Sequence, residues 1–294
     1  MKWDRSVPDI KLFVCCHQPS PVPEHPLLNP IQVGASLADT HFPDFLHDDV
    51  GENISPKNRS YCELTAQYWA WKNVDADYYG FFHYRRYLYP DVNARRPYRI
   101  EREPTLSLLD KLGYVGFADL IRQYDVILPK GEDMYIPVRG HYAAAPFHHG
   151  KDLDLVEKIV QDRHPKMAEP MEKYLSGTVC YFGNIFIMKR QIFHDYCVWL
   201  FPILEEFDSR TDTSGYGPQE RRVDGYLAER LLGIYAGWLV GQASILELPR
   251  VHFVPNGRER QSKCLLNALL PPGTRRRALG KSAGQTAIKS WLHQ

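Results

Sequence analysis

Two consecutive arginines close an aromatic segment that begins at residue 77. They stand in the run His83-Tyr84-Arg85-Arg86-Tyr87. Guanidinium groups carry a fixed charge and donate hydrogen bonds in pairs, a combination that suits a diphosphate. A pair of surface arginines engaged in ion pairs would have the same sequence, so the run alone leaves both interpretations open.

Two acidic residues lie in a later segment of helical pattern, residues 219–239. These are Asp224 and Glu229, and Arg230 follows directly after Glu229. A carboxylate beside a hydroxyl group can remove its proton while the oxygen attacks an electrophile. An ordinary surface helix with a Glu–Arg contact explains the same pattern and is the simpler interpretation when the helix is taken alone.

Two further segments carry polar groups that suit a binding site. His141, His148 and His149 are candidate zinc ligands, but adjacent side chains rarely bind one ion together. We therefore favour a hydrogen bond from His149 to a sugar hydroxyl or a phosphate. Gly183 interrupts an apolar strand pattern, which indicates a bulge or a close backbone approach. Asn184 then either binds a substrate hydroxyl or is satisfied within the bulge.

Residues 60–72 have the pattern of a helix with two tryptophans, Trp69 and Trp71. Ser60 is the expected N-cap and Glu63 occupies the capping-box position. Glu63 and Lys72 are polar side chains that would line a cleft, although a capped amphipathic helix explains the pattern on its own.

Several known motifs are absent. The sequence has no P-loop, no Gly-x-Gly-x-x-Gly and no Gly-x-Ser-x-Gly. An Asp-x-Asp would mark a metal-dependent sugar-nucleotide enzyme if it followed a strand. Asp75-Ala76-Asp77 has this spacing but precedes its strand, and we interpret it as a turn.

The elements that position these residues alternate between strand and helix. This order predicts an α/β fold with a mainly parallel, helix-covered sheet, in which ligands bind beyond the carboxyl ends of the strands. The proline-rich residues 17–59 are expected to be irregular. We expect one domain over residues 1–255 and a basic tail over 256–294. The expected strands are residues 10–16, 77–84, 125–129, 178–188 and 244–254, and the expected helices are 60–72, 106–124, 152–163, 165–175, 190–207 and 219–239.

The composition narrows the class of protein. The 294 residues are 44% hydrophobic with a formal charge of +1, which indicates a globular core and gives no reason to expect nucleic acid as a partner. Six cysteines without a regular framework are typical of reduced thiols in the cytoplasm. No signal peptide is evident, and no apolar stretch reaches the roughly 18 residues that a membrane span needs.

Seven segments, in this order, resemble a family of bacterial capsule and O-antigen glycosyltransferases long classed as a domain of unknown function, some members of which transfer galactofuranose. They are residues 11–17 (KLFVCCH), 30–35 (PIQVGA), 51–55 (GENIS), 61–72 (YCELTAQYWAWK), 79–87 (YGFFHYRRY), 183–188 (GNIFIM) and 225–231 (GYLAERL).

The resemblance implies a GT-A-like fold and a UDP-sugar donor. It implies that His83, Arg85 and Arg86 occupy the place of the usual Asp-x-Asp, and we expect Tyr84 to bind substrate beside them. Our hypothesis is that arginine charge neutralises the leaving UDP in place of a metal, although Mn²⁺ or Mg²⁺ is not excluded. Glu229 is the expected base of an inverting transfer, with Asp224 as second candidate. The residues expected to border the nucleotide are His17, Gln32, Gly34 and Asn53.

The expected acceptor is a polysaccharide or a lipid-linked glycan. The basic tail would hold the enzyme on the anionic cytoplasmic face of the inner membrane, although a solvated tail explains it almost as well. Three alternatives stay open. The first is a transferase of the same fold whose donor is UDP-galactopyranose or UDP-glucose. The second is a non-catalytic carbohydrate-binding module that stacks sugars on Trp69 and Trp71. The third is a hydrolase with a histidine-bound metal.

Overall fold

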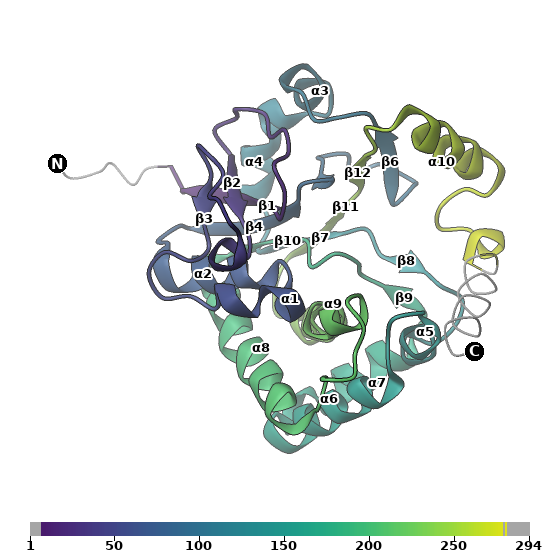
Figure 1. Cartoon of the computed structure of the whole chain (residues 1–294). Coiled ribbons are helices and arrows are strands. Elements are labelled where there is room, and N and C mark those ends of the chain that lie inside the picture. The colour runs from purple at the N-terminus through teal and green to yellow at the C-terminus, as the bar shows by residue number, and fades with distance from the viewer. Residues whose placement is uncertain (1–6, 279, 281–294) are drawn as a thin grey trace.

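The computed structural model describes residues 7–278 and 280, and in this part of the chain ten strands form one sheet (Figure 1). Seven of them make a continuous path: β1 (Ile10–Cys16), β2 (Leu28–Gln32), β3 (Leu46–His47), β4 (Tyr78–His83), β7 (Val126–Pro129), β10 (Phe186–Lys189) and β11 (Ile245–Leu248). The spatial order is β11-β7-β10-β4-β1-β2-β3. Every pairing along this path is parallel except the two that β10 makes. The expected α/β fold with a mainly parallel sheet is confirmed.

A smaller ribbon extends the sheet next to β4. It consists of β5 (Arg86–Leu88), β6 (Tyr98–Glu101) and β12 (Arg250–Phe253), with β12 between the other two. A separate pair is formed by β8 (Glu132–Asp133) and β9 (Val179–Cys180).

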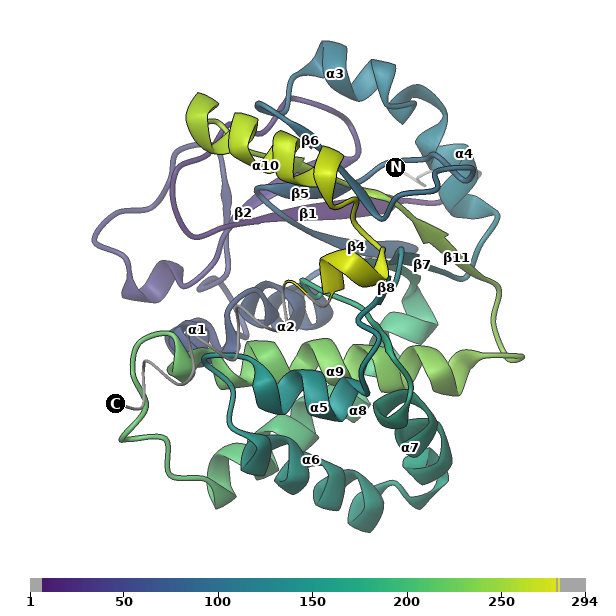
Figure 2. The ribbon, with the colours of Figure 1, turned by 90° about the vertical axis from the view of Figure 1, so that its right-hand side faces the viewer.

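Helices cover both faces of the sheet (Figure 2). One face carries α3 and α4, α10 lies against β6, and the remaining helices lie on the other side of the sheet. Their bounds are α1 Asn58–Tyr61, α2 Leu64–Asn73, α3 Leu106–Lys111, α4 Phe117–Arg122, α5 Val138–Ala144, α6 Gly150–Arg163, α7 Ala168–Ser176, α8 Arg190–Arg210, α9 Val223–Leu239 and α10 Gly257–Leu269.

The central strand β1 is apolar on both faces because helices cover both of them. Phe13 and Cys15 belong to the core shared with α2, α8 and α9. Leu12 and Val14, which alternate with them, belong to the core under α3 and α4. The strand is therefore fixed in register, and its carboxyl end delivers His17 to the edge of the sheet.

Five local expectations were wrong. The expected helix 106–124 divides into α3 and α4, and the expected strand 244–254 divides into β11 and β12. The proline-rich segment supplies β2, in which Pro30 pairs with Val14 of β1. The expected helix 60–72 breaks at Cys62, which has a φ of +51°. The capping box does not form, because the Ser60 hydroxyl donates to Asp224 of α9 and the Glu63 carboxylate accepts the Asn184 amide. The expected strand 178–188 divides into β9 and β10, with a turn between them.

No helix of the described residues is long and apolar enough to cross a membrane. The stretch expected to be a basic tail begins with α10, which contacts β6. Lys281 and Lys289, which contribute to the basic character of the tail, lie outside the described residues.

Candidate active site

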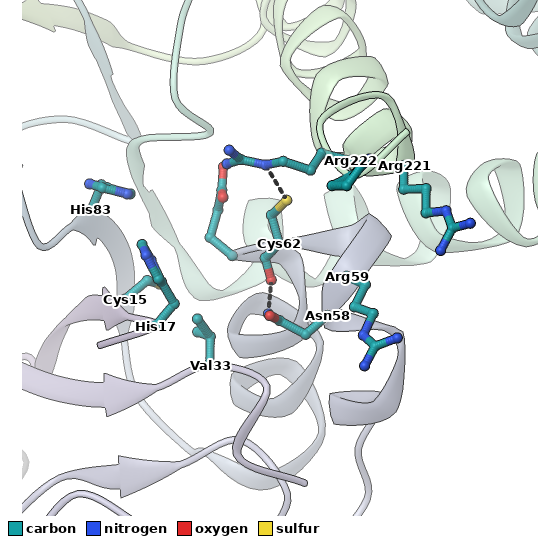
Figure 3. A pocket seen from close by; sticks show the side chains of 11 residues that line it. Cys15, His17, Val33, Asn58, Arg59, Cys62, His83, Arg221 and Arg222 are labelled. Atoms are coloured by element: carbon teal, nitrogen blue, oxygen red, sulfur yellow. Dashed lines mark hydrogen bonds between the residues drawn. The ribbon is translucent and has the colours of Figure 1, made fainter. Parts of the chain in front are cut away.

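A cavity of about 460 Å³ opens at the carboxyl ends of β1 and β4. These two strands are neighbours, and the chain order along the sheet reverses between them, which is where ligands of open α/β sheets bind. We call it the strand-end cavity (Figure 3). It is lined by Cys15, His17, Val33, Asn58, Arg59, Cys62, Glu63, His83, Pro218, Arg221 and Arg222.

Two histidines form the wall next to the strands. The ring centroids of His17 and His83 are 6.4 Å apart. Burial, and then the charges of Arg86 and Arg85, hold the pKa of His83 well below its usual value, so its ring is neutral. Nδ1 of His83 accepts the backbone N–H of Arg85 at 3.2 Å, which leaves Nε2 with the hydrogen. His83 therefore offers an uncharged donor.

The opposite wall carries Arg222, on the turn that leads into α9. Its Nε donates to the Cys62 sulfur at 3.3 Å, and Figure 3 shows its side chain reaching to Cys62 while Arg221 points away. Glycine at 225 lets α9 pack closely on Cys62, because a Cβ there would lie 3.2 Å from the same sulfur and Cys62 would have to shift slightly. Within residues 7–278, no carboxylate lies within ion-pair distance of the Arg222 guanidinium, and Glu63, which lines the same cavity, interacts with its charge from further away.

A second cavity, of about 700 Å³, shares Arg222 with the first. Glu229 of α9 lines it, and we call it the glutamate cavity. Oε1 of Glu229 accepts the backbone N–H of Gly183 at 2.7 Å, and Oε2 lies 3.6 Å from the guanidinium of Arg230. Arg230 is 1% exposed, and its charge lies over the rings of Tyr142 and Phe182 at 5.7 and 5.5 Å. The carboxylate is thus fixed on two sides while it faces the cavity.

Arg85 lies in the turn between β4 and β5, whereas Arg86 is the first residue of β5. Arg86 lines the glutamate cavity, where one guanidinium nitrogen would lie 3.5 Å from a Cβ on Gly183. Burial and the nearby Arg250 lower the pKa of Arg86. Arg85 lies over the ring of Tyr84 at 4.9 Å and lines neither of the two cavities. The two arginines therefore do not converge on either of these two cavities.

Glu63 and Asn184 join α2 to the turn that carries Gly183. The Asn184 amide donates to Glu63 at 2.8 Å and to the carbonyl of Gly225 at 3.0 Å. Burial raises the pKa of Glu63. Gly183 and Asn184 have φ values of +93° and +49°, so the turn is tight. The Asn184 amide is used within the protein, as the second interpretation of the sequence expects.

The other residues expected to border the nucleotide organise the loop after β1. Gln32 donates to the carbonyl of Thr40 and accepts the N–H of Phe42. Asn53 bonds to the backbone of residues 49, 51 and 55. Gly34, at a φ of +67°, donates its N–H to Asp48. None of the three lines either cavity, so they shape the loop.

Lys72 and His149 lie away from both cavities. Lys72 pairs with Glu52 at 3.2 Å and lies over the ring of Trp71. His149 pairs with Glu220 and stacks on Tyr216. His148 instead lies between Tyr142 and Tyr226. It lines the glutamate cavity together with His141, whereas His149 does not. No group of three or more potential metal ligands occurs in the part of the chain that the structure describes.

Trp69 and Trp71, the expected platforms for sugar stacking, pack into the protein. Trp69 is 8% exposed and donates to the carbonyl of Val50. Trp71 stacks on Phe201. Neither ring is presented as an open platform for a sugar.

Asp224 is fully buried and accepts a hydrogen bond from Ser60. Burial, with Asp208 adding to it, raises its pKa to about 7, against about 3.9 in an unfolded chain. The folded state therefore binds the proton more tightly, and the stability that this proton confers is lost as the pH rises from about 4 to 7. The position suits a structural carboxyl group that ties α9 to α1.

We expect Asp224→Asn to be more stable than the natural protein at pH 8, by about 2–4 kcal/mol. The difference should shrink steadily as the pH falls toward 4, where both side chains are neutral. Urea unfolding of the two proteins at pH 4.5, 6 and 8 measures it. A difference that does not change with pH would show that Asp224 does not titrate in this range.

Sequence reasoning missed two residues that organise the site. Arg222 joins the two cavities. Its signal was the Arg-Arg pair at 221–222, directly before a helix. Asp48 is fully buried and accepts the N–H groups of Gly34 and Ala35 and the hydroxyl of Ser55. Nothing in its neighbourhood along the chain distinguishes it from an exposed loop aspartate.

The fold agrees with comparisons to known proteins. Residues 11–238 match the family described as Domain of unknown function (DUF4422), and the chain belongs to this family. It is similar to the apo structure of the bifunctional glycosyltransferase WbbM, with 30% sequence identity and a TM-score of 0.78. The match covers 83% of this chain and 45% of that chain, so this protein corresponds to less than half of WbbM. No curated protein matches the chain.

Proposed function

We propose that the protein is a glycosyltransferase that moves a sugar, with galactofuranose as first choice, from a UDP-sugar to a polysaccharide or lipid-linked glycan acceptor in bacterial capsule or O-antigen synthesis. The observation that carries the proposal is the junction at Arg222. On one side is a strand-end cavity with donors for a nucleotide, and on the other is a cavity with a fixed carboxylate. The similarity to WbbM over most of this chain supports it.

In this arrangement the nucleotide occupies the strand-end cavity. The diphosphate lies at the junction, between Arg222 and Arg86, and the sugar extends into the glutamate cavity. Arginine charge stabilises the leaving UDP, and the neutral N–H of His83 donates to a phosphate or a ribose hydroxyl. Glu229 accepts the proton of the acceptor hydroxyl while that oxygen attacks the anomeric carbon, so the configuration inverts.

The donor is tested by turnover with UDP-galactofuranose, UDP-galactopyranose and UDP-glucose, each with EDTA or with Mn²⁺, together with a thermal shift for UDP. We expect transfer from one donor, with galactofuranose fastest, and equal rates under both metal conditions. Release of UDP and free sugar from the donor, without transfer to an acceptor, would indicate a hydrolase. Glycan binding with no response to any UDP compound would indicate a binding module and contradict the proposal.

A further inference from the structure

A third cavity, of about 250 Å³, lies between α10 and the ribbon of β6 and β12. Its lining includes four cationic side chains, Arg85, Arg86, Lys263 and Arg277, and among the described residues no aspartate or glutamate lines it. We call it the basic cavity. Lys263 and Arg277 come from beyond residue 238, where the family match ends, so this chain's own C-terminal region completes the cavity.

The charges of the basic cavity are only partly neutralised. Lys263 pairs with Glu259 one turn earlier on α10. The guanidinium of Arg277 approaches the hydroxyl of Tyr98 at 3.4 Å. Within the described chain, neither Arg85 nor Arg86 forms an ion pair. Several guanidinium and ammonium groups around one small space favour a multiply charged anion with many acceptor oxygens, which is the chemistry of a phosphate or diphosphate.

The position of the basic cavity assigns this anion to one substrate. The cavity shares Arg86, Tyr98 and His252 with the glutamate cavity, whereas the strand-end cavity joins the glutamate cavity through Arg222. The three spaces therefore follow one another, with Glu229 in the middle one. If the donor nucleotide occupies the strand-end cavity, the basic cavity is left to the molecule that arrives at Glu229 from the other side.

We propose that the basic cavity binds a phosphate or diphosphate group carried by the acceptor, so that the acceptor is a phosphorylated glycan and not a neutral one. This inference rests on the proposed function. It adds a second anion site, formed by α10 and the segment around Arg277, which orients the acceptor hydroxyl toward Glu229.

The test is a calorimetric titration of the full chain with inorganic pyrophosphate in the presence of saturating UDP. We expect pyrophosphate still to bind, because Arg85, Lys263 and Arg277 remain open to it when Arg86 contacts the UDP diphosphate. The double variant Lys263→Glu/Arg277→Glu should weaken this binding about tenfold or more, with UDP affinity unchanged. Its matched control is Arg258→Glu/Arg276→Glu, which makes the same change of charge on neighbouring exposed residues outside the cavity and should bind pyrophosphate normally.

The kinetic arm compares a phosphorylated acceptor with the same glycan after removal of its phosphate. In the Lys263→Glu/Arg277→Glu variant, KM for the phosphorylated acceptor should rise, and KM for the glycan without its phosphate should stay unchanged. Complete exclusion of pyrophosphate by UDP, or equal behaviour of the two double variants, would overturn the proposal. So would a defect confined to vesicles of anionic phospholipid, which would identify a membrane headgroup as the ligand. Failure of UDP itself to bind would instead refute the proposed function, and the pyrophosphate titration would still report on the basic cavity.

Discussion

Replacing Glu229 by glutamine should lower kcat by about 10³-fold, within the range that general-base groups contribute, and leave the affinity for UDP unchanged. Glutamine preserves the shape of the side chain and can still accept the N–H of Gly183, but it cannot take up a proton from the acceptor. Single-turnover transfer measures the chemical step, and calorimetry measures UDP binding. Near-normal turnover would remove Glu229 from the role of base.

The corresponding substitution at two other carboxyl groups shows whether the loss of turnover is specific to Glu229. Glu63 lines the strand-end cavity and is held by Asn184, so Glu63→Gln should mainly affect donor binding. Asp224 is buried against Ser60, and Asp224→Asn should retain turnover. If Asp224→Asn lost activity and Glu229→Gln retained it, the assignment of the two residues would be reversed.

The double variant Arg86→Ala/Arg222→Ala should bind UDP about 10²- to 10⁴-fold more weakly, since each charge-assisted hydrogen bond contributes about 1.5–3 kcal/mol. Both guanidinium groups border the glutamate cavity, and Arg222 also borders the strand-end cavity. Uridine, which lacks the diphosphate, should bind the variant and the natural protein equally. Competition against a fluorescent UDP derivative measures both ligands.

Two single variants separate this account from the simpler hypothesis that Arg85 and Arg86 act as a pair. Arg85 lies over Tyr84 and lines the basic cavity, so Arg85→Ala should leave UDP affinity nearly unchanged. Arg210→Ala, which removes an exposed arginine paired with Glu206 on α8, controls for loss of charge alone. Equal weakening by Arg85→Ala and Arg222→Ala would contradict the arrangement.

The fold class could be predicted from the sequence because the central strands are continuous apolar or aromatic runs. The buried run Ile10–Cys16 is one strand in the structure with the predicted bounds, and the aromatic segment after residue 77 is β4, next to β1. The prediction that a site lies where these strands end required only the rule for open α/β sheets, and a cavity opens there.

The individual site residues were harder to predict because their contacts are distant in sequence. Ser60 appeared to be a helix cap, yet its hydroxyl bonds to Asp224, 164 residues away. Gln32 and Asn53 were placed near the nucleotide by their position after β1, but their amides are used by loop backbone. Arg222 contacts Cys62, 160 residues away, and no local pattern reports such a contact.

The most direct test of the account is a titration of the purified protein with UDP in EDTA, repeated with Mn²⁺. If guanidinium groups at the junction of the two cavities hold the diphosphate, UDP binds in EDTA with the same affinity as with Mn²⁺, and most of that affinity disappears in Arg86→Ala/Arg222→Ala. No binding in EDTA with full recovery on adding Mn²⁺, or unchanged binding by the double variant, would contradict it.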